Sequence, residues 1–252
     1  PKGETIIVTS AENSGPGTLR QGLLDANIGD TITFDPEVFP PDVSVTIRLT
    51  SPLPELDQGY LTIDASNAGV ILDGSTIDPP YANGLMISSI GNTIQGMQIV
   101  GFPQMGIIMS GAAQKNTIGG NRDIGSGPLG QGNLISSNGE KGIVLSGHGT
   151  SYNFIIGNFI GVDVSGTHAL GNRGGGLLIN GAKFNQVSNN IVSGNDGTGM
   201  EICCTGTINN TISGNLIGTD ISGEAGLGNG GNGIELQGGA SQNIIGPDNI
   251  IA

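Results

Sequence analysis

Residues 157–163 read Gly-Asn-Phe-Ile-Gly-Val-Asp, and the pattern returns at residues 214–220 as Gly-Asn-Leu-Ile-Gly-Thr-Asp. The flanking stretches repeat as well, because residues 133–138 return at 190–195 and the Leu-Gly-Asn of residues 170–172 returns at 227–229. Every pair is separated by 57 positions, as from Asp163 to Asp220. A gapless repeat of this length is typical of a stacked architecture, so the chain is expected to be a repeat protein.

A shorter repeat lies inside this unit, in which an asparagine is followed two places on by isoleucine or valine. The six asparagines are Asn92, Asn116, Asn153, Asn185, Asn210 and Asn243. Their spacing varies while the marker stays constant, which indicates short strands joined by turns of variable length. Three β-branched strands per coil, bounded by glycine and asparagine, predict an all-β parallel β-helix, a solenoid rather than a sandwich. The asparagines are predicted to form a hydrogen-bonded ladder at one corner of the stack.

The first ninety residues differ from the rest. Thr18-Leu-Arg-Gln21 matches a capping box and predicts an amphipathic helix, which would cover the core at the end of the first coil. Strands are predicted near residues 31–34, 45–49, 61–64 and 70–72. We predict one domain, with the cap and irregular coils in residues 1–90 and regular coils in 91–252. The chain stops in mid-coil, so head-to-tail self-association is expected at the open last coil.

Charge narrows the choice of partners. The 252 residues include 8 Lys and Arg against 21 Asp and Glu, which gives a formal net charge of −13. Nucleic acids and anionic membranes bind basic patches, so neither is an expected partner. No stretch of the sequence is long and apolar enough to insert in a membrane. The composition, rich in glycine and poor in cysteine, favours a secreted or cell-surface bacterial protein.

The coils resemble the right-handed parallel β-helix repeat family, the pectate-lyase-like superfamily in its broad sense, from about Asp30 onward. Residues 13–21 and 30–34, with the repeated Gly-Asn-x-Ile-Gly-x-Asp-x-Ser-Gly, are similar to segments of large bacterial cell-surface and secreted proteins. This fold hosts lyases, hydrolases, epimerases, adhesins and binding modules, so the resemblance implies an architecture but not one activity.

Alternation along the strands predicts two rows of outward side chains. One row contains Met86, Ile108, Val144, Leu178, Glu201 and Glu235, and the other contains Gln98, Leu134, Phe159, Ile191, Leu216 and Ile250. The second row is almost wholly apolar, and an exposed apolar strip usually marks an interaction site. In the first row Glu201 and Glu235 are expected to stack about 5 Å apart, where like charges raise one pKa or recruit a cation.

Three functions remain open. The first is a non-catalytic module for adhesion, carbohydrate or protein binding, or end-to-end assembly, with Leu134, Phe159, Ile191, Leu216, Glu201 and Glu235 as binding residues. The second is a lyase or hydrolase on acidic polysaccharides. The resemblance implies an Arg or Lys base and acidic calcium ligands for a lyase; here Lys141, Arg173 and Lys183 would supply base and charge, with Glu201 and Glu235 holding calcium. The third is a spacer without a ligand.

Two further groups are candidate sites. Asp163, Ser165 and Asn172 in one copy, with Asp220, Ser222 and Asn229 in the other, place oxygen ligands on glycine-rich turns, as calcium prefers. The alternative is that these Asp and Ser side chains cap their own turns. Cys203 and Cys204 are adjacent, so they form either a vicinal disulfide or two free thiols.

Overall fold

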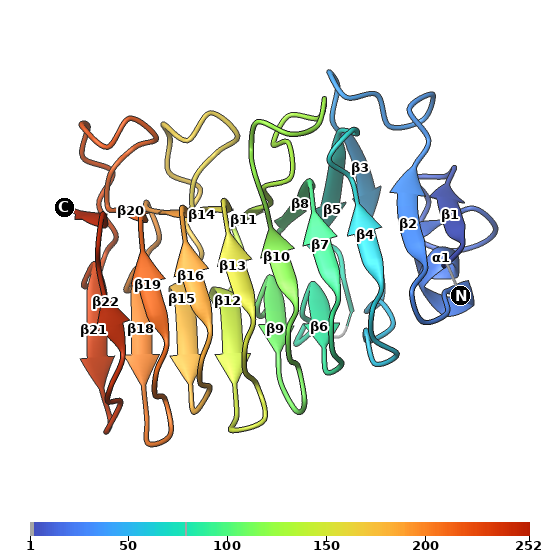
Figure 1. The fold of residues 1–252 in the computed structure, drawn as a ribbon. Coiled ribbons are helices and arrows are strands. Elements are labelled where there is room, and N and C mark those ends of the chain that lie inside the picture. The colour runs from blue at the N-terminus through green and yellow to red at the C-terminus, as the bar shows by residue number, and fades with distance from the viewer. Residues whose placement is uncertain (1–2, 79) are drawn as a thin grey trace.

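The computed structural model describes residues 3–78 and 80–252, which wind through three parallel sheets (Figure 1). Each full coil contributes one short strand to each sheet, and strands of successive coils pair in parallel. The prediction of an all-β, right-handed parallel β-helix is confirmed. Apart from the strands, the described residues contain one short helix.

Sheet 1 has nine strands: β1 (Thr5–Val8), β2 (Thr31–Phe34), β4 (Thr62–Asp64), β7 (Thr93–Gln95), β10 (Thr117–Gly119), β13 (Phe154–Ile156), β16 (Gln186–Ser188), β19 (Thr211–Ser213) and β22 (Ile244–Ile245). Sheet 2 has eight: β3 (Val45–Arg48), β5 (Val70–Asp73), β8 (Met97–Val100), β11 (Leu134–Ser136), β14 (Phe159–Ile160), β17 (Ile191–Val192), β20 (Leu216–Ile217) and β23 (Ile250–Ile251). Sheet 3 has six: β6 (Leu85–Ile87), β9 (Ile107–Met109), β12 (Lys141–Ser146), β15 (Gly175–Asn180), β18 (Met200–Cys203) and β21 (Ile234–Gln237).

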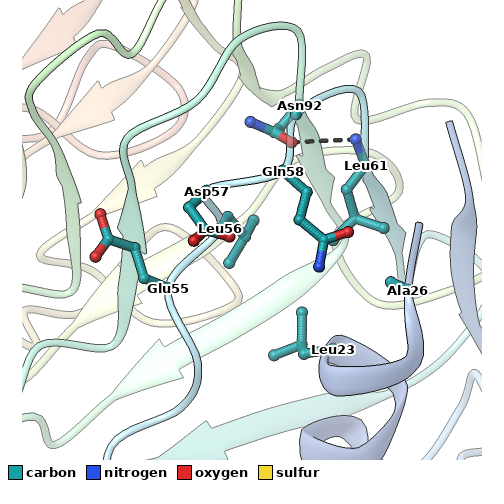
Figure 2. A pocket seen from close by; sticks show the side chains of 9 residues that line it. Leu23, Ala26, Glu55, Leu56, Asp57, Gln58, Leu61 and Asn92 are labelled. Atoms are coloured by element: carbon teal, nitrogen blue, oxygen red, sulfur yellow. Dashed lines mark hydrogen bonds between the residues drawn. The ribbon is translucent and has the colours of Figure 1, made fainter. Parts of the chain in front are cut away.

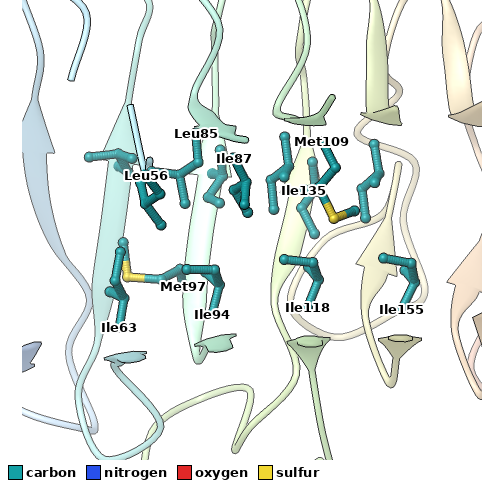
Figure 3. Close-up of a cluster of buried hydrophobic side chains, with 14 of the residues drawn as sticks. Leu56, Ile63, Leu85, Ile87, Ile94, Met97, Met109, Ile118, Ile135 and Ile155 are labelled. Atoms are coloured by element: carbon teal, nitrogen blue, oxygen red, sulfur yellow. The ribbon is translucent and has the colours of Figure 1, made fainter. Parts of the chain in front are cut away.

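The core is built from stacked aliphatic side chains. In sheet 1 the inward position is isoleucine in four successive coils, Ile63, Ile94, Ile118 and Ile155, each with no exposed surface. Figure 3 shows these side chains in line along the stack. Full burial of one such side chain stabilises the fold by about 1.5–3 kcal/mol, so a chain with few aromatic residues can still build a core.

The predicted asparagine ladder is confirmed, and the structure contains two more that the sequence reasoning missed. The first ladder, at the corner between sheets 3 and 1, joins Asn92, Asn116, Asn153, Asn185, Asn210 and Asn243. The second, between sheets 1 and 2, joins Asn133, Asn158, Asn190, Asn215 and Asn249. The third, between sheets 2 and 3, joins Asn138, Asn172, Asn195 and Asn229. Each of the three corners of the coil therefore carries its own ladder.

The N-terminal helix α1 (Leu19–Asp25) is confirmed, with Leu19 and Leu23 buried against the first coil. Thr18 Oγ1 accepts a hydrogen bond from the backbone N–H of Gln21, as a capping box requires. The Gln21 amide donates to Asp25 instead of returning to Thr18, so only half of the box forms. No helix in the described ranges is long and apolar enough to cross a membrane.

Candidate functional site

Both rows of outward positions have the predicted register. Met86 pairs with Ile108, Val144 with Leu178, and Glu201 with Glu235 along sheet 3. Along sheet 2, Leu134 pairs with Phe159, which pairs with Ile191. The register holds because an inward and outward alternation of period two is fixed once one face of the strand is buried.

The prediction that the second row is an exposed apolar strip is wrong. Leu134, Phe159 and Ile191 are only 2%, 4% and 0% exposed, and they form a second apolar cluster with Leu129 and Val162. The loops between the strands fold over the row and cover it. These side chains therefore stabilise the loops and present no surface to a ligand. Further along the row Leu216 is half-buried and packs against the cluster, whereas Ile250 is exposed.

Sheet 3 carries a charged cluster on its outer face. Lys141 Nζ lies 2.9 Å from Glu201 Oε2, and the side-chain amide of Gln237 donates to Glu201 Oε1 at 2.8 Å. Lys141 is on β12 and Glu201 on β18, so the lysine reaches past β15. A Cβ at Gly175 of β15 would lie 3.1 Å from Lys141 Nζ, so the absence of a side chain there leaves room for the lysine.

The pKa of Glu201 in this cluster shifts in the direction opposite to one expectation from the sequence. A neighbouring carboxylate was expected to raise one pKa of the glutamate pair, but the pKa of Glu201 is lowered. The main cause is the hydrogen bond from Lys141, with the lysine charge and Gln237 adding to it and partial burial opposing it. The cation next to the glutamates is Lys141 itself. Glu235 accepts a long hydrogen bond, 3.4 Å, from Thr198.

The other two basic candidates lie at opposite ends of the same strand of sheet 3, β15. Arg173 is exposed at the corner that precedes β15, one coil after the corner that carries Lys141. Lys183 follows β15 at the corner toward sheet 1, where its segment bridges to Ser151. The structure thus brings Lys141, Glu201 and Glu235 together, keeps Arg173 at the same corner as Lys141, and separates Lys183 from them.

The six predicted calcium ligands fall into two groups. Asp163 and Asp220 each accept hydrogen bonds from the serine two places on and from backbone N–H groups of their own turns. Burial raises the pKa of Asp163, but the hydrogen bonds of its turn outweigh burial and lower the pKa. In Asp220 the hydrogen bond from Ser222 is the main cause of a lowered pKa, with burial opposing it. Asn172 and Asn229 are instead members of the third ladder, where both their side-chain atoms are already hydrogen-bonded. No group of three or more His, Cys, Asp or Glu that could hold a metal occurs in residues 3–78 and 80–252, so calcium stays a prediction.

The two cysteines are joined by a disulfide at the edge of the charged cluster. Cys203 lies on β18 two residues after Glu201 and pairs with Gln237 of β21, the residue that donates to Glu201. Both cysteines are partly exposed. The disulfide therefore forms an apolar border on the same face of sheet 3.

An exposed aromatic pair was not singled out by the sequence reasoning. Tyr152 and Phe184 precede ladder asparagines in successive coils, and both have left-handed backbone angles, with φ of 58° and 57°. Their rings stack 5.1 Å apart and 6° from parallel, with 48% and 37% of each residue exposed. The signal in the sequence was an aromatic residue directly before the asparagine of two consecutive coils.

The surface of the described residues includes a hollow at the N-terminal helix and another at a corner of the coil. One lies between α1 and residues 55–61, with Leu23 and Leu56 as apolar walls and Glu55, Asp57 and Gln58 at its rim (Figure 2). Figure 2 also shows Asn92 accepting a hydrogen bond from the backbone of Leu61, which extends the first ladder into this coil. The other hollow lies beside Arg122, at the corner between sheets 1 and 2. Neither hollow contains a residue of the charged cluster.

Comparison with solved structures agrees with the fold. The chain is similar to a pectate lyase, Pel9A, with a TM-score of 0.59 and 12% identity over 97% of this chain and 62% of that one. It is also similar to an alginate lyase from Paenibacillus sp. str. FPU-7, with a TM-score of 0.57 and 17% identity over 96% of this chain and 76% of that one. The chain thus spans less than two thirds of the pectate lyase. No family model matches it, and no curated protein matches it.

Proposed function

We propose that this protein acts outside the cell on an acidic polysaccharide, which lies along the outer face of sheet 3. The observation that carries the proposal is the convergence of Lys141, Glu201, Glu235 and Gln237 on a strand face. Similarity in fold to structures named as a pectate lyase and an alginate lyase supports an acidic polysaccharide as the substrate.

The cleavage expected at such a site is an elimination next to a uronate carboxylate. That reaction needs a base at the carbon beside the carboxylate and positive charge near the carboxylate oxygens. Lys141 is the candidate base and Arg173 the candidate partner for the carboxylate. Lys141 donates a hydrogen bond to Glu201, so it must separate from Glu201 and lose a proton before it can act as the base.

Calcium would be held here by Glu201 and Glu235, the stacked carboxylates of β18 and β21. The fit is partial, because both oxygens of Glu201 already accept hydrogen bonds from Lys141 and Gln237. Calcium neutralises carboxylates of an acidic ligand when it is bound, which would offset repulsion by a chain of net charge −13.

Binding without cleavage is the second candidate function. The ion pair between Lys141 and Glu201 favours it, since a charged lysine binds carboxylates but does not act as a base. The exposed Tyr152–Phe184 pair also favours it, because aromatic side chains present at the surface are common in binding sites.

The test is incubation with polygalacturonate and with alginate, each with and without calcium, followed by two measurements. Ultraviolet absorbance reports the unsaturated product of elimination, and co-sedimentation with insoluble polysaccharide reports binding. We expect product from the native protein and at least a hundredfold slower formation in Lys141→Met, since loss of a positioned base removes about 10²–10⁴ in rate.

Lys183→Met is the matched control. It removes the same charge at the corner where the strands of sheet 3 end, whereas Lys141 lies where they begin. It should leave product formation unchanged. Binding that disappears in Lys141→Met, with no product from the native protein, would support the non-catalytic function. If the native protein gives no product and shows no binding with any of these polysaccharides, both proposals are wrong.

A further inference from the structure

Arg122 is held in an unusual position for a charged side chain. It lies in the loop between β10 and β11, and its guanidinium carbon is 5.0 Å from the centre of the Phe159 ring. Its Cγ passes over Gly132, where a Cβ would lie 3.1 Å away. The side chain is thus fixed against a buried aromatic ring, which a guanidinium favours through cation–π attraction.

The guanidinium has donors but no acceptor. Among the described residues it forms no hydrogen bond and no ion pair, and Nη1 is shielded from solvent without a partner. Burial lowers the pKa of Arg122, with the charge of neighbouring Asp123 opposing the effect. In contrast, Arg20 donates to backbone carbonyls of Asn13, Ser51 and Pro52, and Arg48 donates to Asp73. A buried donor left unpaired costs about 1–3 kcal/mol. The other guanidinium nitrogens, Nε and Nη2, also form no hydrogen bond among the described residues, so they remain able to donate to an acceptor supplied from outside.

The loop that carries Arg122 is fixed by contacts with an earlier coil. The backbone N–H of Ser126 donates to the Asn67 side chain at 3.0 Å, and that of Gly127 donates to the Ser66 carbonyl at 2.8 Å. Within the loop, Gln131 donates from its backbone to the Asn121 carbonyl. Arg122 therefore needs little rearrangement to bind a ligand, which reduces the entropy lost on binding.

Arg122 also lines an open hollow. The other lining residues are Gly120, Asn121, Asp123, Ile156, Gly157 and Asn189. Of the arginine nitrogens only Nη1 is both buried and unpartnered, so Nε and Nη2 keep access to solvent. The amides of Asn121 and Asn189 can donate and accept hydrogen bonds with hydroxyl groups.

We propose that Arg122 anchors a binding site for the carboxylate group of an acidic sugar. The planar guanidinium fork matches a carboxylate in two parallel hydrogen bonds, and the Phe159 ring behind it holds the fork in place. The two asparagines suit sugar hydroxyls. This site is at the corner between sheets 1 and 2, and it depends neither on the sheet 3 cluster nor on cleavage.

Asp123 provides a test of this site, because it places a negative charge close to Arg122. Its carboxylate lines the same hollow and repels an incoming anion. Asp123→Asn should therefore strengthen the binding of an acidic sugar, by about twofold to fivefold for a solvent-exposed charge. A substitution that improves affinity cannot be explained by loss of folding.

The experiment follows the arginine Nε–H signals of the labelled protein by NMR while D-galacturonate, D-galactose or acetate is added. The chain has only four arginines, Arg20, Arg48, Arg122 and Arg173, so Arg122→Lys assigns its own signal by removing it. Galacturonate should shift the Arg122 signal, and galactose, its neutral counterpart, should not. Affinity measured by calorimetry should fall at least about tenfold in Arg122→Lys, because a hydrogen bond to a charged group contributes about 1.5–3 kcal/mol.

Controls separate this site from others. Arg48→Lys, which changes an exposed arginine that pairs with Asp73 and does not line the hollow, should leave galacturonate binding unchanged. Equal affinity for acetate and galacturonate would support a site for the carboxylate alone. Tighter binding of galacturonate than of acetate would support a site that also contacts the rest of the sugar. The proposal is overturned if no carboxylate shifts the Arg122 signal, or if Arg122→Lys, folded by its amide spectrum, binds galacturonate as well as the native protein.

Discussion

The Lys141–Glu201 ion pair joins two coils that are not neighbours, since β15 lies between β12 and β18. Both side chains are mostly shielded, with 15% and 20% of their surface exposed. The pair is therefore screened less than a surface salt bridge, yet it avoids the full desolvation of a buried one. The pair also occupies the Lys141 side chain, which must be released from Glu201 before it could act as a base in cleavage.

Removing the Glu201 charge should make stability less dependent on pH. The pKa of Glu201 is lower in the folded than in the unfolded protein, so its contribution is fully present above the unfolded value, near 4.3. That contribution is lost as the pH falls through the lower, folded value. Glu201→Gln should cost about 1 kcal/mol at pH 7 and much less at pH 3, measured by urea denaturation. Glu235→Gln is the control, and a cost in Glu201→Gln that is the same at both pH values would contradict the expectation.

Asn158 shows how much one ladder residue contributes. Its oxygen accepts two hydrogen bonds from Asn133, and its nitrogen donates to Asn190 and to the Ile118 carbonyl. Asn158→Ala would remove these four buried hydrogen bonds and leave the backbone N–H of Asn133 without its partner, so a loss of about 3–5 kcal/mol is expected. Chemical denaturation measures it, and Asn232→Ala, which changes an exposed asparagine, should cost little. A loss near 1 kcal/mol in Asn158→Ala would mean that water replaces the missing amide.

Loops, rather than strands, decide what the surface of sheet 2 looks like. The repeated Gly-x-Asp-x-Ser-Gly segment ends in Gly166, and a Cβ there would lie 3.0 Å from the Phe159 ring and 2.9 Å from Ile221. The turn before it is closed by Asp163, which accepts from Ser165 and Thr167. The motif thus makes a self-supporting lid over the apolar row.

Opening this lid should expose the apolar row. Gly166 has φ of +69°, so Gly166→Ala combines backbone strain with a steric clash and should cost about 2–4 kcal/mol. Gly147→Ala is the matched control, because φ is +89° there and no atom lies within 4 Å of an added Cβ. Thermal unfolding and binding of a hydrophobic dye measure both variants. Equal destabilisation of the two would show that the clash with Phe159 has no effect.

For the molecule as a whole, repulsion between like charges is the main long-range contribution to folding stability. A formal net charge of −13 makes the folded chain repel itself, so added salt should stabilise it. We expect the melting temperature to rise between 10 mM and 200 mM sodium chloride, on the order of a few degrees. A melting temperature that falls or stays constant would show that local ion pairs outweigh the repulsion.

The same measurement tests the predicted calcium site. Calcium chloride at matched ionic strength should reproduce the effect of sodium chloride if calcium acts only by screening. A further rise that disappears in Asp163→Asn would support a site at the repeated turns. Asp57→Asn is the control for charge, since Asp57 is an exposed aspartate outside these turns.

Spacing alone predicted the architecture and the register, down to the pairing of Glu201 with Glu235. It did not predict the burial of Phe159, because alternation gives the face of a side chain but not the path of a loop over that face. The repeat likewise predicts Asn172 as a metal ligand, because its position there does not reveal that its side chain donates a hydrogen bond to Asn195. The stacking of Arg122 on Phe159 joins two segments whose proximity depends on the folded loop.

The 57-residue repeat of the sequence spans two coils, because Phe159 of β14 and Leu216 of β20 are two strands apart in sheet 2. Duplication of such a segment adds a whole number of turns, so every inserted side chain keeps its orientation and every ladder continues. Each added copy would lengthen the rod by about 10 Å, two strand spacings, without disturbing either end. The protein can thus change its reach in fixed increments by copying a single stretch of its gene.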